Sequence, residues 1–211
     1  MQQLEQIADQ IREQMEKTNA ARDLAYQRSR ELTRVCARSI RATHREEWDL
    51  ARQLIAEARS AAQAMIEGVE KAPALYYAGY TQDALKELVE ARVTLRLISH
   101  RPLPAVEEAT IPLNTYLNGV CEAASELRRR CLDLLRQEAF EEAERLLDAM
   151  DAVYEVLMSI AYPDAVTRGL RRRVDQLRGV LERTRGDLTS SMQMVRLRQA
   201  LKAYDHQART D

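Results

Sequence analysis

Glycine, proline and aromatic residues are scarce in this chain, and their scarcity limits the folds open to it. Only 6 Gly and 5 Pro occur among 211 residues, and aromatic side chains make up 5%. Turns between strands depend on Gly and Pro, and strands are enriched in aromatic residues, so a sheet-rich fold is disfavoured. The remaining sequence is rich in Ala, Leu, Glu, Arg and Gln, which favour helices. We predict an all-α fold and a single domain over residues 1–211, with a polar tail from about Asp205.

A large net charge, long apolar segments and paired cysteine motifs are also missing. The 32 basic residues balance 33 acidic ones, so any nucleic-acid surface must be local. The most apolar stretch, 153–162, contains Glu155 and is far shorter than the roughly 20 residues of a membrane span. The three cysteines show no metal-type spacing, and the start of the chain lacks the layout of a secretion signal. These absences predict a soluble, cytoplasmic protein without a membrane-spanning segment.

Apolar residues recur at helical spacing in six long segments. The expected helices cover about 2–43, 46–67, 81–99, a segment that begins after Pro112, 140–161 and 164–202. The first of these, about 40 residues long, reaches roughly 60 Å at 1.5 Å per residue. Because one small bundle cannot bury such a helix, its far end is expected to pack on another subunit. The sequence therefore predicts an oligomer.

A basic stripe lies in the second half of the first expected helix. We call it the arginine stripe, and it consists of Arg30, Arg34, Arg38, Arg41 and Arg45, with His44 among them. Arginines three or four residues apart share one helix face and can follow a phosphate backbone with their planar donor groups. The alternative is a solvated face, which the neighbouring acids Glu31, Glu46 and Glu47 would favour.

Two pairs of glutamates are placed on single helix faces. Glu87 and Glu90 are three residues apart, and Glu122 and Glu126 are four residues apart. Two such pairs on two helices can converge into four carboxylates, and oxygen-only ligands suit Mg2+ or Mn2+. The alternative is that each pair lies on a solvated face. No histidine stands three residues after any of these acids, which argues against a di-iron bundle.

Several short motifs occur in an order that resembles the translin family, and its Trax branch (translin-associated factor X) more than translin itself. Residues 29–33, SRELT, resemble a family segment of the first helix, and 87–91, ELVEA, resemble the Trax-type EYVEA. Residues 116–120, YLNGV, followed by SEL at 125–127, resemble the family's YLxGV and GEL. The segments 147–151 and 170–175 fit its later helices. The likeness spans about residues 22–188.

This resemblance implies a translin-like, all-α bundle of about six to seven long antiparallel helices and assembly into hollow octamers. It also implies binding of single-stranded RNA or DNA, with Mg2+-dependent endoribonuclease activity in Trax-type subunits and none in translin subunits. Glu87 and Glu90 match the two glutamates of the Trax motif, and Glu126 matches the glutamate of GEL. Glu122 stands where Trax has an aspartate, so the charge is kept on a longer side chain.

The resulting hypothesis is a Mg2+-dependent endoribonuclease for single-stranded RNA, assembled as a hollow homo-oligomer. The four carboxylates hold Mg2+, the metal lowers the pKa of a bound water, and that water attacks a phosphodiester. Glu126 or Glu122 acts as general base, and the arginine stripe holds the substrate backbone. One alternative is a non-catalytic shell that binds single-stranded RNA or DNA. The other is an all-α nucleoside triphosphate pyrophosphohydrolase, which also uses paired acids on helices.

Overall fold

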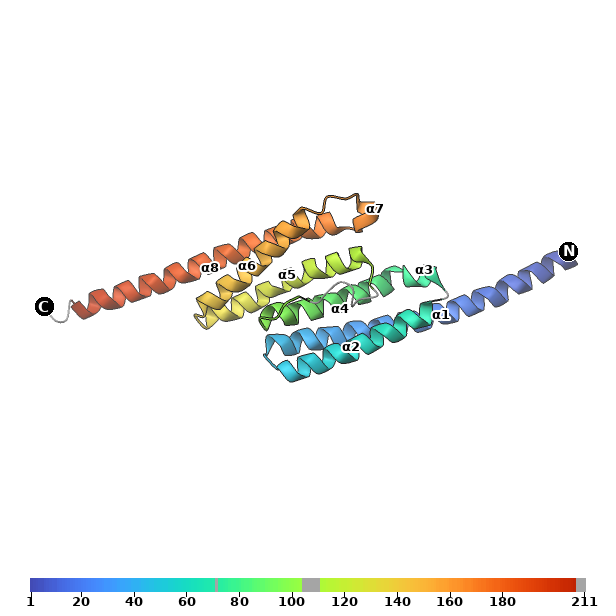
Figure 1. Cartoon of the computed structure of the whole chain (residues 1–211), viewed down its shortest axis with the longest axis horizontal. Coiled ribbons are helices and arrows are strands. Elements are labelled where there is room, and N and C mark those ends of the chain that lie inside the picture. Colours follow the sequence, from blue (N-terminus) through green and yellow to red (C-terminus); the bar gives the residue numbers. More distant parts are fainter. Residues whose placement is uncertain (71, 104–110, 208–211) are drawn as a thin grey trace. The chain divides into compact units, whose positions relative to one another are not determined.

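The computed structural model describes residues 1–70, 72–103 and 111–207, which form helices and short connections without any strand (Figure 1). The helices are α1 (Gln2–His44), α2 (Trp48–Val69), α3 (Pro73–Tyr76), α4 (Gly79–Ile98), α5 (Leu113–Arg136), α6 (Phe140–Met158), α7 (Asp164–Thr167) and α8 (Leu170–Gln207). The predicted all-α fold is confirmed. Pro104 of the predicted loop after α4 and residues 208–211 of the predicted tail lie outside the described residues.

The last predicted helix is divided in two by a glycine. Arg168 and Gly169 have φ angles of 47° and 83°, in the left-handed region that glycine occupies without strain. The backbone N–H of Gly169 donates a hydrogen bond to Asp164 Oδ1 at 2.7 Å, which closes the turn after α7. A new helix, α8, then begins at Leu170 and continues to Gln207, two residues beyond the predicted start of the polar tail.

The chain divides into two compact units, which are described separately. Unit 1 takes its described residues from 1–95 and 104–119, and unit 2 takes them from 96–103 and 120–211. Helices α4 and α5 each contribute residues to both units. The single domain predicted from the sequence stays a prediction.

In unit 1, α1 and α2 form an antiparallel hairpin (Figure 1). Near the turn, Ser39 Oγ donates to the backbone oxygen of Ala51 at 3.1 Å, and further along Arg28 Nη1 donates to that of Ala64 at 2.6 Å. The side chains buried in these two helices include Leu32, Val35, Cys36, Leu54 and Met65. Burial of each large apolar side chain stabilises the hairpin by about 1.5–3 kcal/mol.

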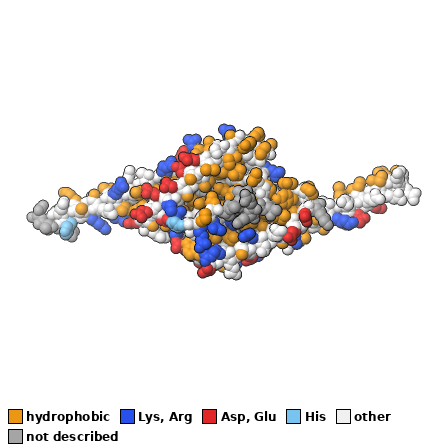
Figure 2. Space-filling view, viewed as in Figure 1, with side chains coloured by type: hydrophobic (Ala, Val, Ile, Leu, Met, Phe, Trp, Pro, Cys, Tyr) orange, Lys and Arg blue, Asp and Glu red, His pale blue; other side chains and the backbone are white. Residues whose placement is uncertain are grey.

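The N-terminal part of α1 carries an apolar stripe that unit 1 leaves exposed. Leu4, Ile7, Ile11 and Met15 recur at helical spacing and are 46–66% exposed. Figure 2 shows hydrophobic side chains along this part of the helix, at the N-terminal end of the view. A contiguous exposed stripe of this kind is typical of a surface that another protein covers.

Helices α4 and α5 lie side by side in unit 1. Thr115 Oγ1 donates a hydrogen bond to Gln82 Oε1 at 2.6 Å, and the two residues are only 5% and 7% exposed. The start of α4 is attached to α3, because Gln82 Nε2 donates to the backbone oxygen of Tyr76 at 2.6 Å. A buried polar pair of this kind holds the two helices in one register, since a shift would leave both groups without partners.

Unit 2 consists of the later part of α5 with α6 and α8. Arg128 of α5 donates to Thr184 Oγ1 at 3.0 Å and to Asp187 Oδ2 at 2.7 Å, which ties α5 to α8. Arg185 of α8 pairs with Asp151 of α6 at 3.0 Å. The core between them contains Leu127, Leu146, Met150, Leu170 and Leu177. Among the described residues, no helix has the length and apolar character needed to cross a bilayer.

Candidate functional site

The acid pair of α4 lies in a buried part of that helix. Glu87 and Glu90 are both half-buried, and the residues between them, Leu88 and Val89, belong to the core. The chain contains the same spacing at Glu141 and Glu144 of α6, where both side chains are exposed. The α4 pair therefore differs from an ordinary solvated pair by its partial removal from water.

Gly119 allows α5 to approach the acid pair of α4 closely. A Cβ atom at this position would lie 2.6 Å from Val89 Cβ and 2.8 Å from the backbone oxygen of Lys86. Only a glycine lets two helix backbones come this near without a clash. Thr115 contacts Gln82 and Gly119 contacts 86–89, so α5 runs parallel to α4 along this stretch. Glu122 follows Gly119 by three residues and thus leaves the same face of α5.

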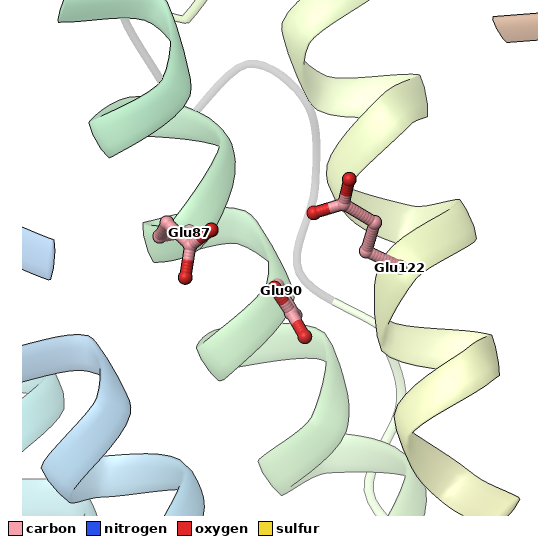
Figure 3. A group of neighbouring side chains, drawn as sticks. All are labelled: Glu87, Glu90 and Glu122. Atoms are coloured by element: carbon pink, nitrogen blue, oxygen red, sulfur yellow. The ribbon is translucent and has the colours of Figure 1, made fainter. Parts of the chain in front are cut away.

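Three carboxylates meet at this helix pair. One carboxylate oxygen from each of Glu87, Glu90 and Glu122 lies within 4.8 Å of the others. Figure 3 shows Glu87 and Glu90 on α4 and the carboxylate of Glu122 extending from α5 toward them. We call these three residues the glutamate cluster. Like charges this close repel one another unless cations compensate them.

Two basic side chains compensate part of the negative charge of the glutamate cluster. Lys86 Nζ lies 3.3 Å from Glu87 Oε1, and Arg173 Nε donates to Glu122 Oε1 at 2.8 Å. Both ion pairs are largely shielded from solvent, with side chains 11–29% exposed. Arg173 thereby orients Glu122.

The patterns described above do not predict the contact between Arg173 and Glu122. A signal for it is present in the apolar repeat of α8. Arg173 lies three residues after Leu170 and four before Leu177, both of which are buried. A charged residue at such a position is half-buried and usually has a partner.

Two thiols adjoin the cluster and remain protonated. Burial, together with the charges of Glu87 and Glu90, raises the pKa of Cys36 to about 12. Burial also raises the pKa of Cys121 to about 12, with the charge of Glu122 acting in the same direction. Neither sulfur belongs to the group of ligand atoms that lie within 4.8 Å of one another. The remaining donors are carboxylate oxygens, and the glutamate cluster could therefore bind a hard metal ion.

Glu126 is not part of the group of three. It lies one turn after Glu122 on α5 and is half-buried. The four predicted carboxylates thus separate into three that lie within 4.8 Å of one another and one that adjoins them along the helix.

The five arginines of the arginine stripe are exposed, four of them on one face of α1 and Arg45 directly after the end of that helix. Arg34 pairs with Glu31 at 2.6 Å and Arg45 with Glu47 at 2.9 Å, in ion pairs open to solvent. Such pairs contribute only about 0–1 kcal/mol, so a phosphate can displace them. His44 is 6% exposed and lies in the core, so it does not share the surface of the arginines.

Comparisons with known proteins agree on one fold. No protein-family model matches the chain. An uncharacterized protein of Methanocaldococcus jannaschii is 32% identical over 180 residues, which cover 82% of this chain and 78% of that protein. The crystal structure of AfC3PO is similar with a TM-score of 0.81 and 30% identity, covering 90% of this chain and 98% of that one.

Two further solved structures extend this likeness. The AfC3PO complex with duplex RNA has a TM-score of 0.70 and 32% identity, over 90% of this chain and 97% of that one. Apo-NeC3PO has a TM-score of 0.79 at 22% identity, over 87% of this chain and 96% of that one, and so shows the fold alone. Together with the order of the sequence motifs, these similarities show that the chain belongs to the translin family, as a relative of the translin- and Trax-like C3PO proteins.

Proposed function

We propose that this protein is a metal-dependent endoribonuclease of the Trax-like branch, which cuts single-stranded RNA inside a hollow homo-oligomer. The observation that carries the proposal is the convergence of Glu87, Glu90 and Glu122 to within 4.8 Å in a chain of the translin family. A pure RNA-binding shell has no need for three half-buried acids, because their mutual repulsion and their proximity to phosphates oppose binding.

The roles of the side chains follow from their positions. Glu87, Glu90 and Glu122 hold the cation, and Arg173 keeps the carboxylate of Glu122 oriented through its 2.8 Å hydrogen bond. Bound Mg2+ or Mn2+ supplies Lewis-acid activation of water and charge stabilisation for phosphodiester hydrolysis. The carboxylate of Glu126, one turn along α5, accepts the proton of the attacking water as general base.

The arginine stripe binds the substrate backbone in this proposal. Its five guanidinium groups extend along α1 over 15 residues, or about 22 Å at 1.5 Å per residue. Each can pair with a phosphate oxygen and release a counterion, which supplies affinity without sequence preference. A similar solved structure is a complex with duplex RNA, which supports RNA as the ligand class.

The three cysteines are buried free thiols, in keeping with a cytoplasmic location.

Cleavage of a labelled RNA tests the activity directly. We expect internal cuts in a single-stranded RNA with Mg2+ or Mn2+, and none after addition of a chelator. The same assay on free nucleoside triphosphates distinguishes the nuclease from a pyrophosphohydrolase, because only the latter would release pyrophosphate. Binding of RNA without cleavage in any divalent metal would contradict the nuclease and favour the shell.

The mass of the assembly in solution tests the homo-oligomer. We expect an octamer, as the resemblance to the translin family implies. We also expect another subunit to cover the apolar stripe of Leu4, Ile7, Ile11 and Met15 on α1, which is exposed in the single chain. Light scattering after size-exclusion chromatography measures that mass. A monomer at micromolar concentration would contradict both the octamer and the assignment of this stripe to a subunit contact.

A further inference from the structure

A cavity of about 880 Å³ opens in unit 1 between α1 and α4, beside the residues already described. Its wall includes Tyr26, Arg30, Glu31, Arg34, Tyr80 and Asp83. The volume lies in the range of sites that bind small organic groups, about 300–1,000 Å³. The wall thus combines two aromatic rings, two cations and two acids.

The aromatic rings form one side of this cavity. Tyr26 and Tyr80 contact each other edge to face, with ring centroids 5.7 Å apart and planes at 88°. In this geometry the edge of one ring meets the face of the other. Tyr26 is 44% exposed, so a flat ligand can reach it. The buried hydroxyl of Tyr80 has no hydrogen-bond partner among the described residues.

The charges around the cavity distinguish between the parts of a nucleotide. Arg30 and Arg34 belong to the exposed arginine stripe and can contact phosphates at the rim. Asp83 on the opposite helix carries a carboxylate that repels a phosphate and accepts hydrogen bonds from amino groups. In nucleic acids, exocyclic amino groups occur on bases, and carboxylates pair with the amino group of cytosine.

The cavity lies on the same face of α4 as two of the three residues of the glutamate cluster, Glu87 and Glu90. Tyr80, Asp83, Glu87 and Glu90 follow one another at intervals of three and four residues, the spacing of a single helix face. Asp83 precedes Glu87 by one turn, about 6 Å, and Tyr80 precedes it by about 10 Å. A strand that rises on the order of 3 Å per stacked nucleotide covers this distance in about three nucleotides.

We propose that this cavity is a base-binding subsite, which holds a nucleobase of single-stranded RNA a few nucleotides from the phosphodiester at the glutamate cluster. The base stacks on Tyr26, its amino group donates to Asp83, and Arg30 and Arg34 contact the flanking phosphates. The inference rests on the proposed function for the position of the cut, but base binding itself requires no cleavage. It assigns a base preference to a protein whose arginine stripe would bind any sequence.

Removal of the Tyr26 ring tests the stacking contact. Binding is measured in chelator, where no cleavage occurs, with a cytidine oligonucleotide and with an abasic ribose-phosphate strand of equal length. Tyr26→Ala is expected to weaken binding of the oligonucleotide about tenfold and to leave binding of the abasic strand unchanged. Tyr26→Phe keeps the ring and is expected to retain most of the affinity. Tyr162→Ala removes an exposed tyrosine of unit 2 and serves as the matched control.

The base preference is tested with Asp83→Asn. Cytosine presents an amino group where uracil presents a carbonyl oxygen, so the native protein is expected to bind oligo(C) about tenfold more tightly than oligo(U). Asparagine can donate as well as accept, so the preference is expected to fall below about twofold in the variant.

Three results would overturn the subsite. The first is equal binding of oligo(C) by the native protein and Tyr26→Ala, which leaves the nuclease proposal intact. The second is an equal loss of affinity for the abasic strand in Tyr26→Ala, which would mean that Tyr26 supports the fold or contacts the RNA backbone. The third is failure of the native protein to bind any strand, which would overturn the proposed function as well. An effect of Tyr26 on binding without any cleavage in Mg2+ supports the subsite and contradicts only the nuclease.

Discussion

Replacement of Glu87 and Glu90 by glutamine is expected to reduce cleavage of single-stranded RNA by about 10²- to 10⁴-fold. The change removes two of the three negative charges of the glutamate cluster while keeping side-chain size. A bound cation contributes several kcal/mol of transition-state stabilisation, and each 1.4 kcal/mol is tenfold in rate. RNA binding in chelator is expected to persist or improve, because two negative charges are lost near the phosphates. The measurement is a time course of cleavage at saturating Mg2+.

Glu141→Gln with Glu144→Gln is the matched control, because it makes the same change at the same spacing on an exposed helix face. The control is expected to cleave at the native rate. Thermal unfolding with and without Mg2+ distinguishes a loss of metal binding from a loss of folding stability. If the proposal is right, Mg2+ at 100 times its Kd is expected to stabilise the native protein by about 2.7 kcal/mol and not to stabilise the Glu87 and Glu90 variant. Cleavage by this variant at the native rate would rule out the glutamate cluster as the active site.

Replacement of Gly119 by alanine is expected to destabilise the protein and to suppress cleavage. An added Cβ would meet Val89 Cβ at 2.6 Å and the backbone oxygen of Lys86 at 2.8 Å, so α4 and α5 must separate. Such overpacking costs about 1–3 kcal/mol, which outweighs the gain of up to about 1 kcal/mol in helix propensity. The displacement occurs one turn before Glu122, and a shift of about 1 Å in catalytic groups can cost 10²-fold in rate.

Substitution of Gly186 by alanine is a control that is expected to change stability in the opposite direction. It lies inside α8, and a Cβ there meets no atom within 4 Å. Gly186→Ala is therefore expected to raise the midpoint of thermal unfolding, whereas Gly119→Ala lowers it. If Gly119→Ala also raised the midpoint, α5 could not approach α4 as closely as these distances require.

Most helix positions follow from the sequence alone, because apolar residues at intervals of three and four mark the buried face of each helix. The predicted first helix, 2–43, and the observed α1, Gln2–His44, differ by one residue. The division of 164–202 into α7 and α8 was missed, since Gly169 within a helical pattern is compatible with both outcomes. A left-handed φ at this glycine distinguishes a divided helix from a continuous one, and that φ is set by the turn and not by the residue type alone.

The candidate site was predictable only in part. Spacing placed Glu87 and Glu90 on one face and Glu122 and Glu126 on another, but the two pairs looked equivalent. The packing of α5 on α4 includes Glu122 in the group of three and leaves Glu126 outside it. It also brings Arg173 of α8 to Glu122, across 51 residues of sequence. Contacts between distant segments depend on helix offsets that no local pattern contains.

By itself, the sequence determined the all-α class, the long helices up to α6, the family and the residue types available for chemistry, because each of these depends on local periodicity or on the order of short motifs. Tertiary structure alone decided which acids converge, which basic groups hold them and where a cavity opens between Tyr26 and Tyr80. The reason is physical: a side chain's charge and size belong to the residue, but its distance to a partner is set by packing. At the glutamate cluster that distance depends on the absence of a single Cβ atom at Gly119.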